Sequence, residues 1–151
     1  MMIKKILNTE SNWGAFIARL TLGIVLFPHG AQKMLGWFGG YGFADTVDAF
    51  MNQMNLPWFV AFAVIIIEFY GSVFLILGLG SRIWSLAIAG LFVGIIFTTH
   101  LEHGFFMNWF GNQAGEGYEY ALLIIGIAIA VLINGSGKYA LDSRLIKLIN
   151  K

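Results

Sequence analysis

Four long apolar segments constrain the fold of this chain more than any other feature of its sequence. A helix that crosses the hydrocarbon core of a bilayer needs about 20 predominantly apolar residues. The chain offers such segments at residues 13–35, 57–79, 82–104 and 118–134. Only 11% of its residues are charged, whereas soluble domains carry about 25%. The sequence therefore predicts an all-α integral membrane protein, folded as one four-helix bundle over residues 1–151.

The distribution of lysine and arginine predicts the orientation of this bundle. The connections at residues 36–56 and 105–117 contain no Lys or Arg. Apart from Arg19 and Lys33, the basic residues lie in the N-terminal segment, at the turn near residue 82 and in the tail after residue 134: Lys4, Lys5, Arg82, Lys138, Arg144, Lys147 and Lys151. Because basic loops stay on the cytoplasmic side, we expect both termini in the cytoplasm.

Two flanking segments are predicted to be interfacial amphipathic helices. Near residues 43–55, acidic and amide side chains recur at three- and four-residue steps opposite apolar ones. Near residues 140–150, Arg144 and Lys147 alternate in the same way with leucines. Such helices lie on a membrane surface, so membrane lipid is an expected partner for both.

Composition also excludes several classes of function. A net charge of +1 argues against nucleic acid as a partner, because nucleic-acid binding needs a basic patch. The chain has no cysteine, which excludes thiol–disulfide chemistry and Cys-ligated clusters in the chain itself. We see no metal-binding motif and expect no metal site.

Six of the ionisable residues within the apolar segments are the best indication of function: Arg19, His29, Lys33, Glu68, His100 and Glu119. A charge at the bilayer centre costs roughly 2.5–3.5 kcal/mol on insertion scales unless it finds a partner or water. Such residues commonly mark ligand or proton sites. The function is therefore expected to depend on these side chains.

Arg19 and Glu68 are predicted to form a structural ion pair. At 1.5 Å per residue, Arg19 lies roughly 8–9 Å from the start of the first span, and Glu68 roughly 16 Å from the start of the second. In an antiparallel arrangement across about 30 Å, the two would differ in depth by only about 5 Å. A long arginine side chain reaches that far.

The other four residues all belong to the predicted outer half of the membrane. His29 and Lys33 lie one helical turn apart, His100 ends the third span and Glu119 opens the fourth. Each has a simpler explanation, since Lys33 can extend to the headgroups and Glu119 can sit favourably at a helix N-terminus. Their shared depth nevertheless predicts one pocket at the outer leaflet, open sideways to lipid.

Aromatic and glycine-rich connections border this predicted pocket. Phe38 follows the first span, and Phe105 and Trp109 follow the third. These rings fit an ordinary aromatic belt at the membrane surface. They also fit a stacking surface for a flat lipophilic ligand, and we predict that Phe38, Phe105, Trp109 and Lys33 bind one.

Several of these residues belong to motifs that recur, in order, in one protein family. The motifs are Arg19 with Gly23, His29-Gly30-Ala31-Gln32-Lys33, Phe38-Gly39-Gly40, Glu68 with Gly71, Gly78 with Arg82, His100 with Gly104-Phe105-Phe106, Gly117-Tyr118-Glu119-Tyr120, and Gly135-Ser136-Gly137 with Asp142. Over residues 18–142 the chain resembles the DoxX family of small four-helix bacterial membrane proteins, related to the DoxD subunit of thiosulfate:quinone oxidoreductase. The resemblance implies residence in the bacterial cytoplasmic (inner) membrane and a link to quinone or redox metabolism. Thiosulfate oxidation is not carried over, because this chain has no cysteine.

The leading functional hypothesis is a membrane subunit of a redox system that binds quinone or quinol. His29 or His100 would bond the carbonyl oxygens, and Glu119 would give or take the proton. Lys33 would stabilise developing negative charge. The sequence shows no redox centre, so electrons would come from a partner protein that is still unidentified.

Three alternatives remain open at this stage. A non-catalytic scaffold that recruits partner enzymes would use the same polar residues to hold the helices together. A haem b protein with His29 and His100 as axial ligands is less favoured, because paired histidines in bundles are more often hydrogen-bonded. A transporter is disfavoured by the absence of inverted repeats.

Overall fold

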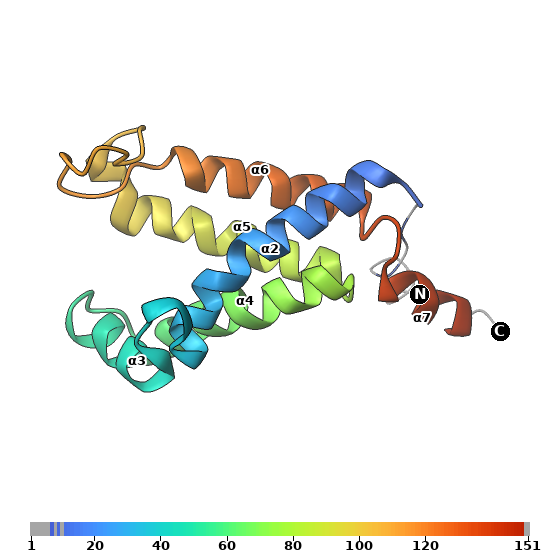
Figure 1. Cartoon of the computed structure of the whole chain (residues 1–151), viewed down its shortest axis with the longest axis horizontal. Helices are drawn as coiled ribbons and strands as arrows, with labels where there is room; N and C mark the ends of the chain where they lie inside the picture. The colour runs from blue at the N-terminus through green and yellow to red at the C-terminus, as the bar shows by residue number, and fades with distance from the viewer. Residues whose placement is uncertain (1–6, 8, 10, 150–151) are drawn as a thin grey trace.

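The computed structural model describes residues 7, 9 and 11–149, and the regular secondary structure of this part of the chain is entirely helical, without strands (Figure 1). Four long helices form the body: α2 (Trp13–Leu35), α4 (Trp58–Leu77), α5 (Ser81–Ile95) and α6 (Glu119–Asn134). A π-helical turn, Ile96–His100, and a short 3₁₀ turn, Leu101–His103, extend α5. Two smaller helices are α3 (Gly42–Asn52) and α7 (Leu141–Ile149). The predicted all-α fold is confirmed.

The four long helices form an antiparallel bundle. Helix α2 packs against α4 and α6, and α5 packs against the same two helices. The start of α2, the α4–α5 turn and α7 lie at one end of the bundle, here called the α7 end (Figure 1). Helix α3 and the connection at residues 104–117 lie at the opposite end, here called the loop end.

The outer surface and the helix lengths suit a membrane. Trp13–Leu35, Trp58–Leu77 and Ser81–His103 are long and apolar enough to cross a bilayer, and Glu119–Asn134 is apolar but shorter. Large apolar side chains cover the outside of the bundle, among them Leu123 and Ile133, which are 66% and 68% exposed. Exposed apolar surface of this extent is expected where lipid replaces water as the solvent. The side of the membrane that each end faces remains a prediction.

A glycine contact brings α2 and α4 close together in the loop-end half. A Cβ atom added at Gly30 would lie only 2.5 Å from the Cα and N atoms of Phe69. The backbones of α2 and α4 can therefore approach one another only because residue 30 has no side chain. This approach sets Lys33 of α2 beside Glu68 of α4.

The predicted ion pair between Arg19 and Glu68 is wrong. Arg19 is 1% exposed, and its guanidinium donates hydrogen bonds to backbone carbonyls instead. Nε donates to Ser136 O (2.7 Å) and Nη2 to Lys138 O (3.2 Å). Nη1 donates to the carbonyls of Leu75 and Ile76, the latter at 2.8 Å. Its partners all belong to the α7 end.

The carbonyls of the last turn of α4 explain this difference, and that of Leu75 also accepts a hydrogen bond from Gly78 N (3.1 Å). The last carbonyls of a helix have no partner within the helix and carry partial negative charge. A planar guanidinium with five donors satisfies several of them together. Arg19 therefore neutralises a helix terminus, and Glu68 takes its cation from Lys33.

Asp142 completes the polar contacts at the α7 end. Its Oδ1 accepts a hydrogen bond from Gly80 N (2.7 Å), and its Oδ2 accepts one from Ser136 Oγ (2.5 Å). The carboxylate thus caps the first turn of α5 from a distant part of the chain. Asp142 is 1% exposed, so these hydrogen bonds are buried and stabilise the fold.

Both predicted amphipathic helices are present. Helix α7 lies within the predicted residues 140–150, of which residue 150 is outside the described residues. Helix α3 ends at Asn52, earlier than predicted, before Asn55 takes a left-handed backbone conformation (φ 52°). Val47 of α3 is buried against Ala61 and Ile65 of α4, so part of its apolar face covers the bundle.

Candidate functional site

A cavity of about 570 Å³ lies in the loop-end half of the bundle and is the candidate site. We call it the histidine cavity and define it by six of its lining residues, which come from α2, α4, the π-helical turn, the loop and α6: His29, Glu68, His100, Trp109, Glu116 and Tyr120. Ligand sites typically have volumes of about 300–1,000 Å³. The cavity is therefore large enough for a small organic molecule.

The histidine cavity reaches the side of the bundle along α2. Val25 and His29 line it there, and both are exposed at the protein surface. Val25 lies in the middle of a predicted membrane span. This exposure supports the predicted sideways opening, since the surface at this depth faces lipid.

Two polar atoms beside the histidine cavity are buried without a hydrogen-bond partner. They are Nδ1 of His100 and Oη of Tyr120. Buried polar atoms nearly always have a partner, so each such atom in a folded protein needs an explanation. Both atoms belong to residues that line the same cavity, where a ligand or an ordered water can supply the missing partner.

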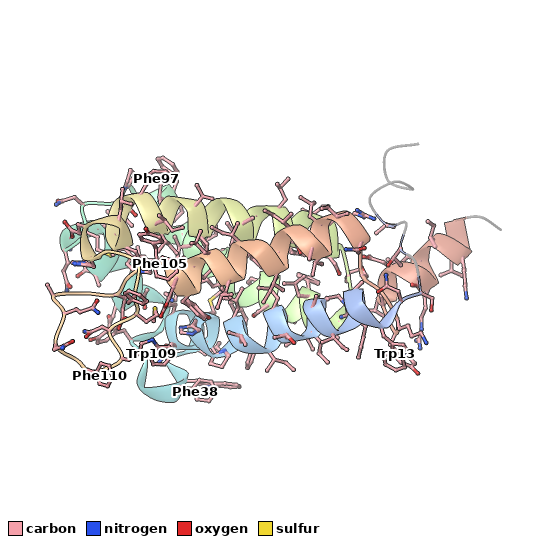
Figure 2. The ribbon with its side chains drawn as sticks, turned by 90° about the horizontal axis from the view of Figure 1, so that it is seen from above. Trp13, Phe38, Phe97, Phe105, Trp109 and Phe110 are labelled. Carbon is pink, nitrogen blue, oxygen red and sulfur yellow. The ribbon has the colours of Figure 1, made fainter. Side chains whose placement is uncertain are left out.

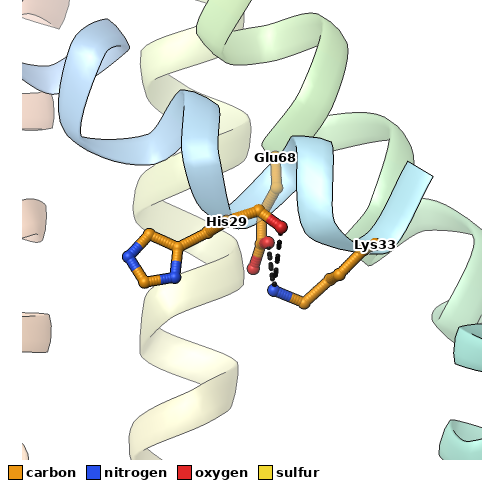
Figure 3. A network of polar contacts seen from close by, with 3 residues as sticks. All are labelled: His29, Lys33 and Glu68. Carbon is orange, nitrogen blue, oxygen red and sulfur yellow. Dashed lines mark hydrogen bonds and ion pairs between the residues drawn. The ribbon is translucent and has the colours of Figure 1, made fainter. Parts of the chain in front are cut away.

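The ion pair in this half of the bundle joins Lys33 to Glu68. Lys33 Nζ lies 2.5 Å from Glu68 Oε2 and donates a long hydrogen bond, 3.5 Å, to the carbonyl of His29 (Figure 3). The side chain of Glu68 is 5% exposed and that of Lys33 is 23% exposed. Lys33 therefore points inward to neutralise Glu68, while the imidazole of His29 points away from the lysine nitrogen.

Glu68 stands between two cavities. It lines the histidine cavity and also a second cavity of about 400 Å³ that contains Lys33, Val64 and Thr98. We call this second space the lysine cavity. Lys33 lines the lysine cavity and is not among the residues of the histidine cavity.

Glu119 faces a different environment from the two histidines. Its Oε1 accepts hydrogen bonds from Met107 N and from Trp109 Nε1, each at 3.0 Å. It lines a third cavity of about 480 Å³, the loop cavity, together with Phe105 and Leu123. Glu119 thus fixes the loop that follows the third span and does not point into the histidine cavity.

The predicted pocket of four residues is therefore corrected. His29 and His100 line one cavity, whereas Lys33 and Glu119 do not join them. Tyr120 and Glu116 line the histidine cavity without having been predicted as site residues, and Glu68 pairs with Lys33 and not with Arg19. Tyr120 comes directly after Glu119, and successive residues of a helix point about 100° apart, so only one of the two faces this cavity.

The predicted aromatic residues divide in a similar way. Trp109 lines both the histidine cavity and the loop cavity, and Phe105 lines the loop cavity alone. Phe38 is 63% exposed and lines none of these three cavities. Figure 2 shows Phe38, Phe105, Trp109 and Phe110 at the loop end, with Trp13 at the other. Aromatic side chains at both ends suit the two membrane interfaces.

A metal centre gains no support from the geometry. Among the described residues, no group of three or more His, Asp or Glu side chains is arranged to hold a metal ion. The chemistry at hand is hydrogen bonding by His100 and Tyr120, with a buried carboxylate and an exposed imidazole beside them.

Comparison with known proteins gives two full-length relatives and one family. The family model named DoxX matches residues 14–101, more than half of the chain. A Bacillus subtilis (strain 168) protein named "Putative oxidoreductase CatD" is 30% identical over 141 residues, which cover 93% of each chain. The Escherichia coli (strain K12) "Inner membrane protein YqjF" is 27% identical over 138 residues, 91% of this chain and 93% of the relative. No solved structure matches the chain significantly.

Proposed function

This chain belongs to the DoxX family of membrane proteins, and we propose that its histidine cavity binds the head group of a quinone or quinol. The membrane would be the bacterial inner membrane, with both termini in the cytoplasm. The name of the Escherichia coli relative supports the location, and the name of the Bacillus subtilis relative supports a redox role.

One observation carries this proposal: the unpartnered Nδ1 of His100 and Oη of Tyr120 belong to the lining of one cavity. A quinone is a flat apolar ring with two carbonyl oxygens, and each oxygen accepts a hydrogen bond. The Tyr120 hydroxyl can donate one, and His100 can donate another in the tautomer with a proton on Nδ1. A ligand of this kind would satisfy both buried atoms.

The neighbouring groups suit the proton chemistry of such a ligand. Reduction of a quinone to a quinol takes up two electrons and two protons. Glu68 and His29 line the cavity and can exchange protons with bound ligand. The electrons would pass through a separate redox protein, the expected partner. The proton role that sequence analysis gave to Glu119 is not retained, because its carboxylate holds Met107 and Trp109.

Binding of a short-chain quinone tests the proposal directly. Protein in lipid nanodiscs is titrated with decylubiquinone, and the bound fraction is measured. Tyr120→Phe removes only the hydroxyl, and loss of one neutral hydrogen bond should weaken binding about 3- to 10-fold. Tyr139→Phe is the matched control, because Tyr139 is 78% exposed at the α7 end.

Two results would count against quinone binding. The wild-type protein would show no saturable binding, or Tyr120→Phe and His100→Ala would both bind as tightly as the wild type. Normal folding without quinone binding would favour a scaffold. An absorbance spectrum of the purified protein is the companion measurement, because a haem Soret band would point instead to haem b held by His29 and His100.

A further inference from the structure

The loop cavity adjoins the histidine cavity and shares part of its wall. Met107, Trp109 and Tyr120 line both spaces. The loop cavity has a volume of about 480 Å³ and is lined elsewhere by Phe105, Glu119, Leu122 and Leu123. The two spaces therefore lie side by side, and a ligand in the histidine cavity that passes the Trp109 indole reaches a second, mainly apolar space.

The loop cavity leads toward lipid. Leu122 and Leu123 of α6 are 46% and 66% exposed, so this side of the cavity meets the outer surface of the bundle. Its one carboxylate is that of Glu119, whose Oε1 already accepts two hydrogen bonds, and its other polar side chains, Trp109 and Tyr120, are shared with the histidine cavity. The space thus suits a hydrocarbon chain and offers little to a polar head group.

We propose that the loop cavity binds the alkyl or isoprenoid tail of the quinone whose head occupies the histidine cavity. This inference rests on the proposed function and adds where the tail lies. Trp109 forms the boundary between head and tail. Its Nε1–H donates to Glu119 Oε1 at 3.0 Å, which makes Glu119 a positioning residue for the indole.

Two other arrangements compete with this one. The acyl chain of an ordinary bilayer lipid can fill the loop cavity without any link to the histidine cavity. Alternatively, the tail can leave along α2, where Val25 and His29 are exposed. The shared wall of three residues favours a tail in the loop cavity, because it places the two spaces side by side.

The experiment compares two probes and two tryptophan substitutions in nanodiscs. The probes are decylubiquinone and the same ring without its decyl chain. Leu123→Trp narrows the loop cavity from an exposed position on α6. Ile133→Trp is the matched control, because Ile133 is equally exposed on the same helix and lines none of the three cavities. Each affinity is compared with wild type for the same probe, so differences in membrane partitioning cancel.

We expect Leu123→Trp to weaken binding of decylubiquinone at least tenfold and to leave the tail-free probe unchanged. Retained binding of the tail-free probe also shows that the variant is folded. Ile133→Trp should match wild type with both probes.

Three outcomes would overturn the inference. Equal affinity of wild type and Leu123→Trp for decylubiquinone would mean that bilayer lipid occupies the loop cavity. A selective loss in Val25→Trp and not in Leu123→Trp would assign the tail to the α2 side. Both outcomes leave quinone binding intact, whereas failure of both probes to bind wild type would overturn the proposed function as well.

Discussion

Substitution of Lys33 by methionine is expected to destabilise the bundle strongly, because it leaves a buried carboxylate without its cation. Lys33 Nζ lies 2.5 Å from Glu68 Oε2, and the Glu68 side chain is only 5% exposed. Glu68→Gln is a milder change. The lysine that remains is 23% exposed and can turn its ammonium toward the surface.

The magnitudes follow from this difference in exposure. Removing one partner of a fully buried pair costs about 3–5 kcal/mol, and partial exposure of Lys33 reduces that value. We therefore expect a loss of about 2–3 kcal/mol for Lys33→Met and about 1 kcal/mol for Glu68→Gln. The double variant removes both charges, so its loss should be about 1–2 kcal/mol smaller than the sum of the two single losses.

The unfolding free energy can be measured by titrating the protein in mixed micelles with sodium dodecyl sulfate. Helix content is followed by circular dichroism, and refolding on dilution checks reversibility. Lys147→Met is the matched control, because Lys147 is an exposed lysine of α7. It should unfold as the wild type does.

Two results would refute this account of the pair. Additive losses in the double variant would show that Lys33 and Glu68 are not coupled in the folded protein. A Lys33→Met protein as stable as the wild type would mean that Glu68 needs no cation beside it.

Three further changes test other parts of the structure. Gly30→Ala should lower the free energy of unfolding by about 1–3 kcal/mol, because the new Cβ would lie 2.5 Å from the Phe69 backbone. Gly126→Ala is its control in the same titration and should not destabilise the protein, because nothing lies within 4 Å of the new Cβ. Arg19→Lys keeps the charge but loses the planar guanidinium with its several N–H donors. Loss of one charged hydrogen bond should lower the free energy of unfolding by about 1.5–3 kcal/mol. Reporter fusions at either terminus should be active in the cytoplasm, and periplasmic activity at either end would refute the predicted orientation.

The helices were predictable because local signals mark their ends. Helix α2 begins and ends at the predicted residues, Trp13 and Leu35. The side chain of Asn12 accepts a hydrogen bond from Ala15 N (2.6 Å), and Gly36 takes the left-handed conformation that ends many helices. Such signals act over a few residues, so one sequence is enough to read them.

The partners of Arg19 were not predictable in this way. Residue types suggest an acidic side chain as the partner of an arginine, and Glu68 lies at a similar depth in the bundle. The true partners are carbonyl oxygens of residues 75–76, 136 and 138. Every residue has a backbone carbonyl, so residue types do not reveal which carbonyls at a helix end accept hydrogen bonds from Arg19.

The candidate site depends on the residue at which α6 begins, and helix ends are the part of a helix that sequence patterns predict least accurately. Glu119 is the first residue of α6, and Tyr120 is the second. Neighbouring side chains point about 100° apart on a helix, so a shift of one residue would exchange their environments. In the observed register the carboxylate of Glu119 holds the loop through Trp109, and Tyr120 lines the histidine cavity with its hydroxyl unpartnered. The sequence predicts Glu119 as the site residue, because a charge in an apolar segment is conspicuous. On the proposed function, however, the tyrosine beside it is the residue that contacts the ligand.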